Sequence, residues 1–350
     1  MNQVRSEILR LLRGGAAAWD PATWRRVASR LHADQARRNP VYRGWVRANG
    51  GGKRPSAMPL AAWREARVFC GCGRAREVFE SSGTTSTLRG RHFFRDLAVY
   101  EASVVAGWEW GVGEWMKPGA ASLRRREHGR KFQYLALMPS PTEAPRSSLS
   151  RMLEILARRF EGGPCFWAMR RGKWDWDGLV RRLEKEGRGT DTRVVFGTAF
   201  AWVHFLDWCA ARGRRFRLGR RVLAIETGGY KGRSREVSRE VLHRGMARTL
   251  GIPPGHIQVE YSMCEISSQA WSIGGLLHFP PWCRVRVVPP LAGEKLRRGE
   301  PGILEIHDLA NTDSCAFVRS EDLAVAVGEG FFLAGRVPRA GLKGCSLGHE

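Results

Sequence analysis

The chain has 350 residues, of which 43% are hydrophobic, so it is long enough to bury a sizeable core and too apolar to be disordered. No apolar run reaches the roughly 18 to 20 residues of a membrane-spanning helix, and residues 1–24 lack the pattern of a signal peptide, so we expect a cytoplasmic protein. The formal net charge of +24 comes mainly from arginines scattered along the chain, which either attract an anionic partner or simply cover solvated helix faces.

The first part of the chain, residues 1–76, is expected to be largely helical. Apolar residues recur at helical spacing up to about residue 48, for example at Trp24, Val27 and Leu31. A polar, glycine-rich loop follows at residues 49–52. The residue pattern changes near residue 77, and we place the first domain boundary there.

Residues 77–283 are predicted to form an α/β core. Short apolar strands alternate there with helices, which is the pattern of βαβ units and a largely parallel sheet with flanking helices. The predicted strands are 132–141, 192–197, 221–226 and 257–260, and the predicted helices are 91–110, 151–160, 199–212 and 234–249.

The sequence becomes rich in β-forming residues after about residue 284, in the stretches CRVRVVPP, GILEIHDL and CAFVRSEDLAVAV. We therefore expect a smaller β-rich subdomain over residues 284–334. A short, glycine-rich and basic tail follows at residues 335–350.

The strongest local signal is the sequence ESSGTTSTLRG at residues 80–90. Small hydroxylated residues around a glycine expose backbone N–H groups and hydroxyls that can bind a polyphosphate, and glycine lets the phosphate approach closely. The stretch is not a Walker loop, because the pattern G-x-x-x-x-G-K-[ST] is absent. The alternative interpretation is an ordinary flexible turn.

A second signal lies where the predicted strand 221–226 runs into the sequence ETGGYKGRSR. In open α/β sheets, ligands bind at the carboxyl ends of the strands. The adjacent Gly228 and Gly229 would let a base or ribose lie against the backbone, and Lys231 could meet phosphates. A plain strand–turn–helix connection with solvated arginines is the other interpretation.

Two carboxylates follow later predicted strands. Glu265, in the sequence VEYSMCEISSQ, would hold Mg²⁺ if it faced a bound triphosphate. Asp322, in the sequence FVRSEDL, could accept hydrogen bonds from ribose hydroxyls. Taken singly, they fit a surface glutamate and a turn aspartate as well.

The eight cysteines have no paired spacing and are expected to be free thiols in a reducing compartment. Cys70 and Cys72 form a lone C-x-C without the second pair that a zinc site would need. Cys345 lies in the basic tail, where Lys343 and nearby arginines would favour its thiolate. The alternative is a tail cysteine without a role.

Taken together and in this order, the motifs resemble those of the adenylate-forming superfamily of acyl and aryl ligases. Residues 81–90 are similar to the superfamily's phosphate loop, S-S-G-T-T-G-x-P-K-G. Residues 261–265 resemble its Y-G-x-T-E motif, residues 320–323 its T-G-D-L ribose motif, and residues 335–336 the G-R pair that begins its hinge. The resemblance covers roughly three quarters of the chain.

Within the superfamily the closest resemblance is to LuxE-type acyl-protein synthetases, on the stretches TGGYKGRSRE, EISSQ and the terminal GCSL. It implies a large adenylation domain with mostly parallel sheets and a small C-terminal domain that is largely missing. It also implies ATP and Mg²⁺ as cofactors, an acyl-AMP intermediate, and acyl transfer to a thiol. That thiol would belong to Cys345, a partner reductase, coenzyme A or an acyl carrier protein.

The resemblance further implies roles for the matched residues. Glu265 would bind Mg²⁺, Asp322 would hold the ribose, and Cys345 would receive the acyl group as a thioester. The other implied ATP-binding residues are Ser81, Ser82, Gly83, Thr84, Thr85, Gly228, Gly229, Tyr261 and Arg336.

The phosphate loop departs from the superfamily pattern where Ser86, Leu88 and Arg89 replace a glycine, a proline and a lysine. Arginine keeps the charge of lysine but not its geometry. The chain also stops just after the hinge, which leaves open the cation that stabilises the departing pyrophosphate. Arg89 and Lys231, with Lys343, are the candidates.

The expected function is ATP-dependent activation of a carboxylic acid, with a fatty acid preferred over an aryl acid. Phe200, Trp202 and His204 either line the acyl pocket or belong to the core of their helix. The alternative function is a degenerate ligase or a basic scaffold that binds nucleotide or nucleic acid. The net charge and Ser86 favour the scaffold, whereas the joint presence of the motif residues favours the enzyme.

Overall fold

The computed structural model describes residues 3–52, 54–71, 73–81, 88–116, 132–160, 164–185, 192–229, 235–290 and 294–337. The first part of the chain is helical, as predicted, with α1 (Gln3–Arg13), α2 (Pro21–Arg38) and α3 (Pro40–Ala48). Asp20 and Asn39 cap α2 and α3, because each accepts hydrogen bonds from backbone N–H groups of the first turn. A proline follows each cap at the first helical position, where a backbone N–H would have no partner within the helix.

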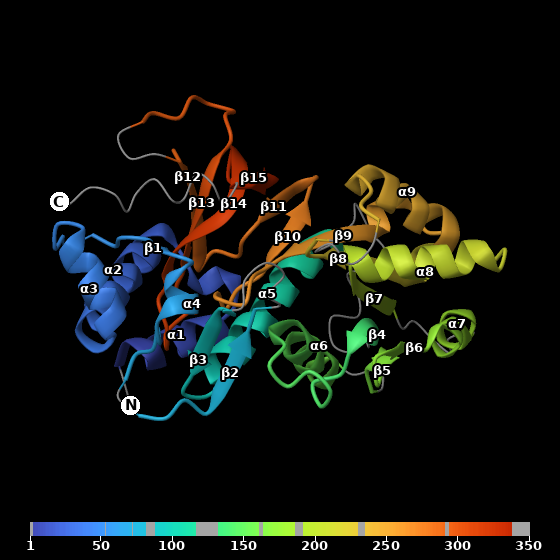
Figure 1. Ribbon diagram of the computed structural model, residues 1–350, viewed down its shortest axis with the longest axis horizontal. Coiled ribbons are helices and arrows are strands. Elements are labelled where there is room, and N and C mark those ends of the chain that lie inside the picture. Colours follow the sequence, from blue (N-terminus) through green and yellow to red (C-terminus); the bar gives the residue numbers. More distant parts are fainter. Residues whose placement is uncertain are drawn as a thin grey trace.

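One large sheet runs through the described part of the chain (Figure 1). Its parallel strands lie in the order β5 (Phe166–Arg170), β4 (Phe132–Pro139), β7 (Thr192–Thr198), β8 (Val222–Thr227) and β9 (Ile257–Tyr261). Most residues of β4, β7, β8 and β9 are buried, as expected for parallel strands that are covered on both faces. This arrangement confirms the predicted α/β core.

Helices cover the two faces of the parallel strands. Alternate side chains point to opposite faces, so Val194 and Phe196 pack with α5 (Ala98–Met116) and α6 (Ser148–Arg159). Val195 packs on the other face with α7 (Trp176–Glu184), α8 (Ala199–Ala211) and α9 (Arg239–Leu250). The parallel strands therefore have a separate apolar core on each side.

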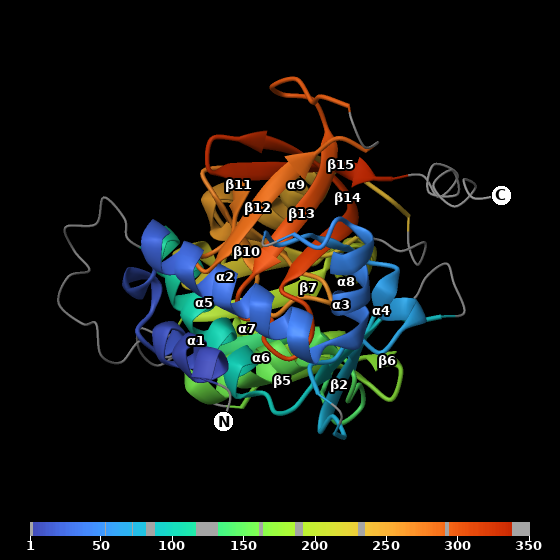
Figure 2. The ribbon, with the colours of Figure 1, turned by 90° about the vertical axis from the view of Figure 1, so that its left-hand side faces the viewer.

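The C-terminal strands continue the same sheet in antiparallel pairing. From β9 the order runs through β10 (Ala270–Ile273), β11 (Leu276–His278), β15 (Gly330–Arg336), β14 (Phe317–Val327), β13 (Gly302–Asp308) and β12 (Cys283–Val288). Two short strands complete the sheet: β6 (Lys173–Trp174) pairs with β5 at the far edge, and β1 (Met58–Pro59) pairs in parallel with the start of β14. The N-terminal helices, with α4 (Ala62–Glu65), pack on these C-terminal strands (Figure 2).

The prediction of a helix over residues 91–110 is wrong at its start. Residues 91–94 form β3 (Arg91–Phe94), which pairs with β2 (Glu77–Glu80) in a two-stranded antiparallel sheet. The helix α5 begins only at Ala98, whose backbone N–H donates to Asp96 Oδ1 over 3.0 Å. Cross-strand pairing with β2 therefore prevails over helical spacing in this segment.

Other boundaries also differ from the prediction. Helix α9 begins at Arg239 and not at residue 234, because Ser238 acts as its N-cap and accepts from the Val241 N–H. Helix α7 and the short strands β5, β6, β10 and β11 carry too little periodic sequence to be predicted. The remaining core elements lie within a few residues of their predicted positions.

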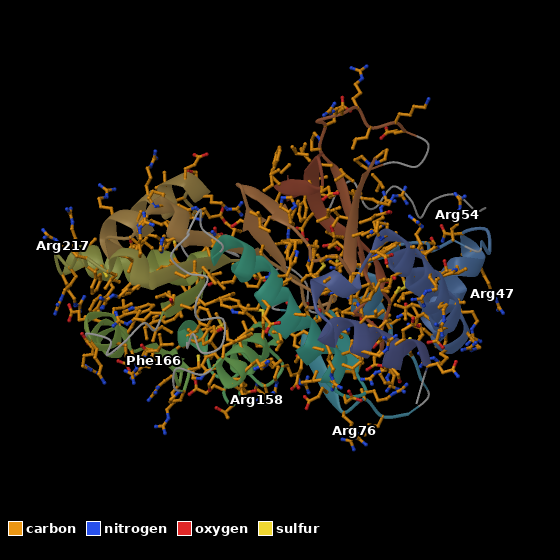
Figure 3. All side chains as sticks on the ribbon, turned by 180° about the vertical axis from the view of Figure 1, so that it is seen from behind. Arg47, Arg54, Arg76, Arg158, Phe166 and Arg217 are labelled. Carbon is orange, nitrogen blue, oxygen red and sulfur yellow. The ribbon has the colours of Figure 1, made fainter. Side chains whose placement is uncertain are left out.

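Arginines lie on all sides of the molecule. The labelled Arg47, Arg76, Arg158 and Arg217 occupy widely separated places around its outline (Figure 3). No helix in the described ranges combines the length and the apolar character required to cross a bilayer. The six cysteines in these ranges are free thiols, as predicted: Cys70, Cys165, Cys209, Cys264, Cys283 and Cys315.

Candidate functional site

The base of the predicted phosphate loop is held by two hydrogen bonds between the strands that flank it. The Ser81 N–H donates to the Gly90 carbonyl over 2.9 Å, and the Gly90 N–H donates to Ser81 Oγ over 2.8 Å. Ser81 follows β2 directly and Gly90 precedes β3. The hairpin therefore fixes both ends of the loop, while residues 82–87 lie outside the described part of the chain.

Glu265 lies against this loop base. A Cβ atom placed on Gly90 would overlap with Glu265 Oε1 and would lie 3.3 Å from Ser81 Oγ. The Glu265 carboxylate therefore packs against the bare Cα of Gly90. The sequence motifs that contain Ser81 and Glu265 are some 180 positions apart, and the fold brings them together.

Gly90→Ala should displace the Glu265 carboxylate while leaving the fold intact. Since the added methyl group would occupy the place of Oε1, the ATP–pyrophosphate exchange that the motifs lead us to expect should fall by about 10- to 100-fold, with little change in thermal midpoint. The matched control is Gly44→Ala in α3, where a Cβ atom meets nothing within 4 Å. ATP–pyrophosphate exchange and thermal unfolding of both variants check this, and unchanged exchange in Gly90→Ala would contradict it.

A second cluster joins β9, β14 and β15. The Tyr261 hydroxyl donates to Asp322 Oδ2 over 2.8 Å, and Arg336 Nε donates to Asp322 Oδ1 over 2.9 Å. Asp322 and Arg336 are directly opposite each other in the β14–β15 ladder. Burial and the charge of Asp322 raise the pKa of Tyr261 well above its usual value, so the phenol stays a hydrogen-bond donor.

The two clusters lie within electrostatic range of each other. Arg64 of α4 pairs with Glu321 of β14, and the charges of Arg64, Glu321 and Arg336 all act on Glu265. Burial raises the pKa of Glu265 to about 7, and the two arginines offset part of that rise. A cation beside Glu265 would favour its ionised form further.

The glycines Gly228 and Gly229 follow β8 at the same edge of the sheet. The preceding Thr227 is directly opposite Glu260 in the β8–β9 pair, one residue before Tyr261. Gly228 has a φ of 59°, in the left-handed region that favours glycine, and both glycines are exposed. The backbone of these two glycines is therefore exposed, as the predicted contact with a base or ribose requires.

Buried polar residues that sequence reasoning missed hold Glu265 in place. Asn311 donates from Nδ2 to the Glu265 carbonyl over 2.8 Å. His92 of β3 lies 2.8 Å through Nδ1 from the Cys264 carbonyl and 2.9 Å through Nε2 from Asn311 Oδ1. Burial lowers the pKa of His92 to about 4, so the ring is neutral at pH 7.

Asp308 anchors the segment that follows Glu265. This fully buried carboxylate accepts from the backbone N–H groups of Ser267 and Ser268 over 2.7 and 2.9 Å, and from the Ser268 hydroxyl over 2.6 Å. It also accepts from the Ala310 N–H over 3.0 Å. The polar stretch NTDS at residues 311–314 was the available signal, because so many polar residues among apolar strands suggest a buried network.

Other predicted residues lie elsewhere or outside the described ranges. Arg89 is exposed beside the loop base. Trp202 is fully buried in the core of α8, where its indole N–H donates to the Ile225 carbonyl over 2.9 Å, while Phe200 and His204 pack beside Trp174. The role of these three in an acyl pocket stays a prediction, and so do those of the residues outside the described ranges: Ser82, Gly83, Thr84, Thr85, Lys231 and Cys345.

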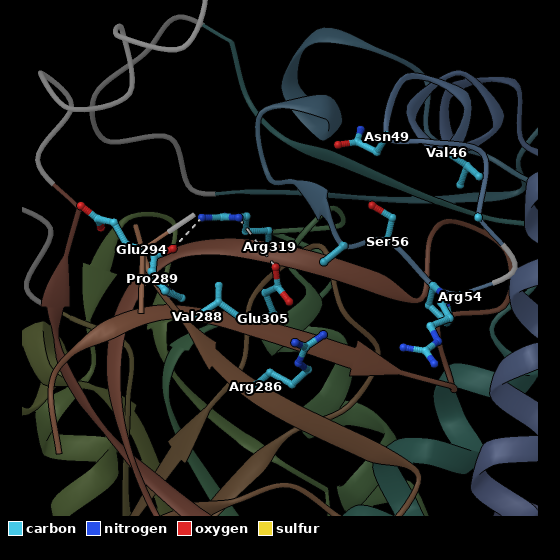
Figure 4. A pocket seen from close by; sticks show the side chains of 13 residues that line it. Val46, Asn49, Arg54, Ser56, Arg286, Val288, Pro289, Glu294, Glu305 and Arg319 are labelled. Carbon is cyan, nitrogen blue, oxygen red and sulfur yellow. Dashed lines mark hydrogen bonds and ion pairs between the residues drawn. The ribbon is translucent and has the colours of Figure 1, made fainter. Parts of the chain in front are cut away.

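A separate pocket of about 430 Å³ lies between residues 46–57 and the C-terminal strands (Figure 4). Its floor carries Arg286, Glu305 and Arg319, which are aligned across β12, β13 and β14. Such a row of alternating charges stabilises neighbouring strands. No residue of the predicted nucleotide site lines this pocket.

No group of three or more metal-binding side chains occurs in the portion of the chain that the structure describes. A single buried carboxylate beside the predicted phosphate loop nevertheless fits Mg²⁺. That ion is commonly held by one or two carboxylates together with substrate phosphates and water. Glu265 has this position, because its Oε1 lies at the base of the loop.

The structure is similar to solved adenylate-forming enzymes. The open conformation of 2-hydroxyisobutyryl-CoA ligase, in complex with 2-HIB-AMP and CoA, matches with a TM-score of 0.65 and 15% identity, over 92% of this chain and 76% of that one. ATP-bound MatB from Rhodopseudomonas palustris matches with a TM-score of 0.50 and 15% identity, over 85% and 58% of the two chains. McyG A-PCP, complexed with phenylalanyl-adenylate, matches with a TM-score of 0.52 and 14% identity, over 75% and 47%.

The chain therefore has the fold of the large N-terminal domain of adenylate-forming ligases. It spans about half to three quarters of the length of these neighbours. No protein-family model matches the sequence, and no curated protein is significantly similar to it in sequence. The predicted superfamily fold is confirmed, and the closer resemblance to LuxE-type synthetases stays a prediction.

Proposed function

We propose that this protein activates a carboxylic acid with ATP and passes the acyl group to a thiol. The observation that carries the proposal is that parts of four separated sequence motifs come together in two neighbouring clusters. Ser81 and Gly90 form the loop base against Glu265, and Tyr261 joins Asp322 and Arg336 alongside. We assign to these groups the roles of a polyphosphate loop, a metal-binding carboxylate and a ribose-binding carboxylate.

In the proposed first step, an oxygen of the acid's carboxylate attacks the α-phosphorus of ATP. The bond from that phosphorus to the bridging oxygen breaks, and pyrophosphate leaves with the electron pair. Catalysis of this kind rests on positioning and on neutralising negative charge. Arg89 and Lys231 are the proposed cations for pyrophosphate, and a bound Mg²⁺, held by Glu265, would neutralise phosphate charge.

In the proposed second step, a thiolate attacks the carbonyl carbon of the acyl-adenylate, and AMP leaves. The acceptor is Cys345, coenzyme A, a carrier protein or a partner reductase. The name of one structural neighbour includes CoA and that of another a PCP, which supports a thiol acceptor. Because of the resemblance to LuxE-type synthetases, a fatty acid is the first substrate class to test. We also propose that the protein is cytoplasmic.

The test is ATP–pyrophosphate exchange with a panel of fatty, aryl and amino-substituted acids. We expect exchange that requires Mg²⁺ and one class of acid. The net charge of +24 favours a second candidate, a basic scaffold that binds nucleic acid or nucleotide without turnover. Absence of exchange with every acid, together with salt-sensitive binding to DNA or RNA, would contradict the proposed enzyme and support the scaffold.

A further inference from the structure

The pocket between residues 46–57 and the C-terminal strands has no part in the proposed chemistry (Figure 4). Its volume of about 430 Å³ lies within the range of roughly 300 to 1,000 Å³ that is usual for small-molecule sites. Five charged side chains line it, of which three are arginines and two are carboxylates: Arg54, Arg286, Arg319, Glu294 and Glu305. The pocket is therefore of ligand size and strongly polar.

One wall of the pocket, residues 54–57, is held in place by the fold. The Trp45 indole N–H donates to Ser56 Oγ over 3.1 Å. Directly after this wall, β1 pairs with β14, and the Leu60 N–H donates to the Arg319 carbonyl over 3.0 Å. Because Ser56 Oγ serves as an acceptor for Trp45, the hydrogen of its own hydroxyl is available to a ligand. The wall thus presents a fixed hydrogen-bond donor to the pocket.

Two of the charged groups on the floor are already engaged with the protein. Arg319 donates from Nη2 to the carbonyls of Pro289 and Pro290 over 3.0 and 3.1 Å, and its Nη1 lies 3.9 Å from Glu305 Oε1. Burial raises the pKa of Glu305, and the charges of Arg286 and Arg319 offset part of that rise. Among the described residues, Glu305 forms an ion pair with Arg319 alone.

Arg54 and Arg286 are not engaged in this way. Within the part of the chain that the structure describes, neither side chain forms a hydrogen bond or an ion pair. Both are exposed, and they extend into the pocket from opposite sides (Figure 4). Glu294 lies across the pocket from Arg54. Because Glu305 is paired with Arg319, the positive charge of Arg54 and Arg286 is left largely uncompensated.

Two guanidinium groups that extend into one space from opposite sides suit an anion with several oxygens. A phosphate monoester has three terminal oxygens and close to two negative charges at pH 7, whereas a carboxylate has two oxygens and one charge. Ser56 can donate to such a group, and Glu305 can accept from hydroxyl groups beside it. We propose that this pocket binds a small phosphate monoester that carries hydroxyl groups, as sugar phosphates do.

The test measures the binding of ribose 5-phosphate, glycerol 3-phosphate and ribose to the full chain by isothermal titration calorimetry, without ATP. At least one ester should bind about tenfold more tightly than ribose, or better, which is the effect of one charged hydrogen bond. Arg54→Gln and Arg286→Gln should each weaken binding of that ester at least about tenfold. The matched control is Arg217→Gln, an exposed arginine at the opposite end of the molecule, which should keep the wild-type affinity (Figure 3).

Several results would overturn the inference. If neither ester binds more tightly than ribose, the pocket does not select phosphate. Binding that is unchanged in both Arg54→Gln and Arg286→Gln would put the phosphate elsewhere, for example at the predicted phosphate loop. An equal loss in Arg217→Gln would show that the net charge of the chain alone attracts the anion.

Inorganic phosphate separates a phosphate monoester from a free anion. We expect it to bind more weakly than the ester, because it lacks the hydroxyl groups that Glu305 can accept from. Equal affinity for the two would make the pocket a site for free phosphate and would contradict the proposed ester. Since none of these measurements involves ATP–pyrophosphate exchange, the inference goes beyond the proposed function and can fail without it.

Discussion

Glu265→Gln is expected to reduce ATP–pyrophosphate exchange by about 100- to 1,000-fold, the usual effect of removing one group that stabilises transition-state charge. The glutamine keeps the shape of the side chain but cannot carry the negative charge that a divalent cation needs. The fold should survive, because the backbone around Glu265 is held by Asn311 and Asp308 and not by its own carboxylate. Exchange assays at several Mg²⁺ concentrations measure the effect.

The control for this substitution is Glu240→Gln, which changes the same charge at an exposed position. Thermal unfolding of both variants should show that neither unfolds early. Because burial penalises the charged form of Glu265, the glutamine variant should be at least as stable as the wild type without ligand. If Glu265→Gln retains exchange within about threefold of the wild type at limiting Mg²⁺, Glu265 does not bind the metal.

The sequence allowed candidate motif residues to be proposed because each motif is local. A phosphate loop needs glycine and hydroxyl groups in a few consecutive positions, and Glu265 follows a strand as predicted. Asp322, predicted to follow a strand, lies instead within β14, opposite Arg336 of β15. The side chains that orient them could not be found in this way. His92, Asn311 and Asp308 belong to β3 and to the 308–315 segment, and only the tertiary fold places them around the backbone of residues 264–268.

For the same reason, helical periodicity in the sequence cannot distinguish pocket-lining residues from core residues. Trp202 and its aromatic neighbours in α8 are as compatible with a helix core as with an acyl site, and the indole N–H of Trp202 is used by a core carbonyl.

Cys345→Ser is expected to abolish the transfer of a labelled acyl group to the protein while leaving ATP–pyrophosphate exchange within about twofold of the wild type. Adenylation needs no thiol, whereas thioester formation needs a thiolate. Most described cysteines are poor candidates for that thiolate. Burial raises the pKa of Cys70 and Cys209 to about 12, and it raises the pKa of Cys165, Cys283 and Cys315 as well.

The matched control is Cys72→Ser, a second cysteine outside the described ranges, which should keep both exchange and labelling. The label should be released by neutral hydroxylamine, as a thioester is. Label that persists in Cys345→Ser would place the acceptor on another residue or on a separate molecule. Parallel loss of exchange would show instead that Cys345 or its surroundings contribute to the nucleotide site, because a residue that acts only as acyl acceptor affects the second step alone.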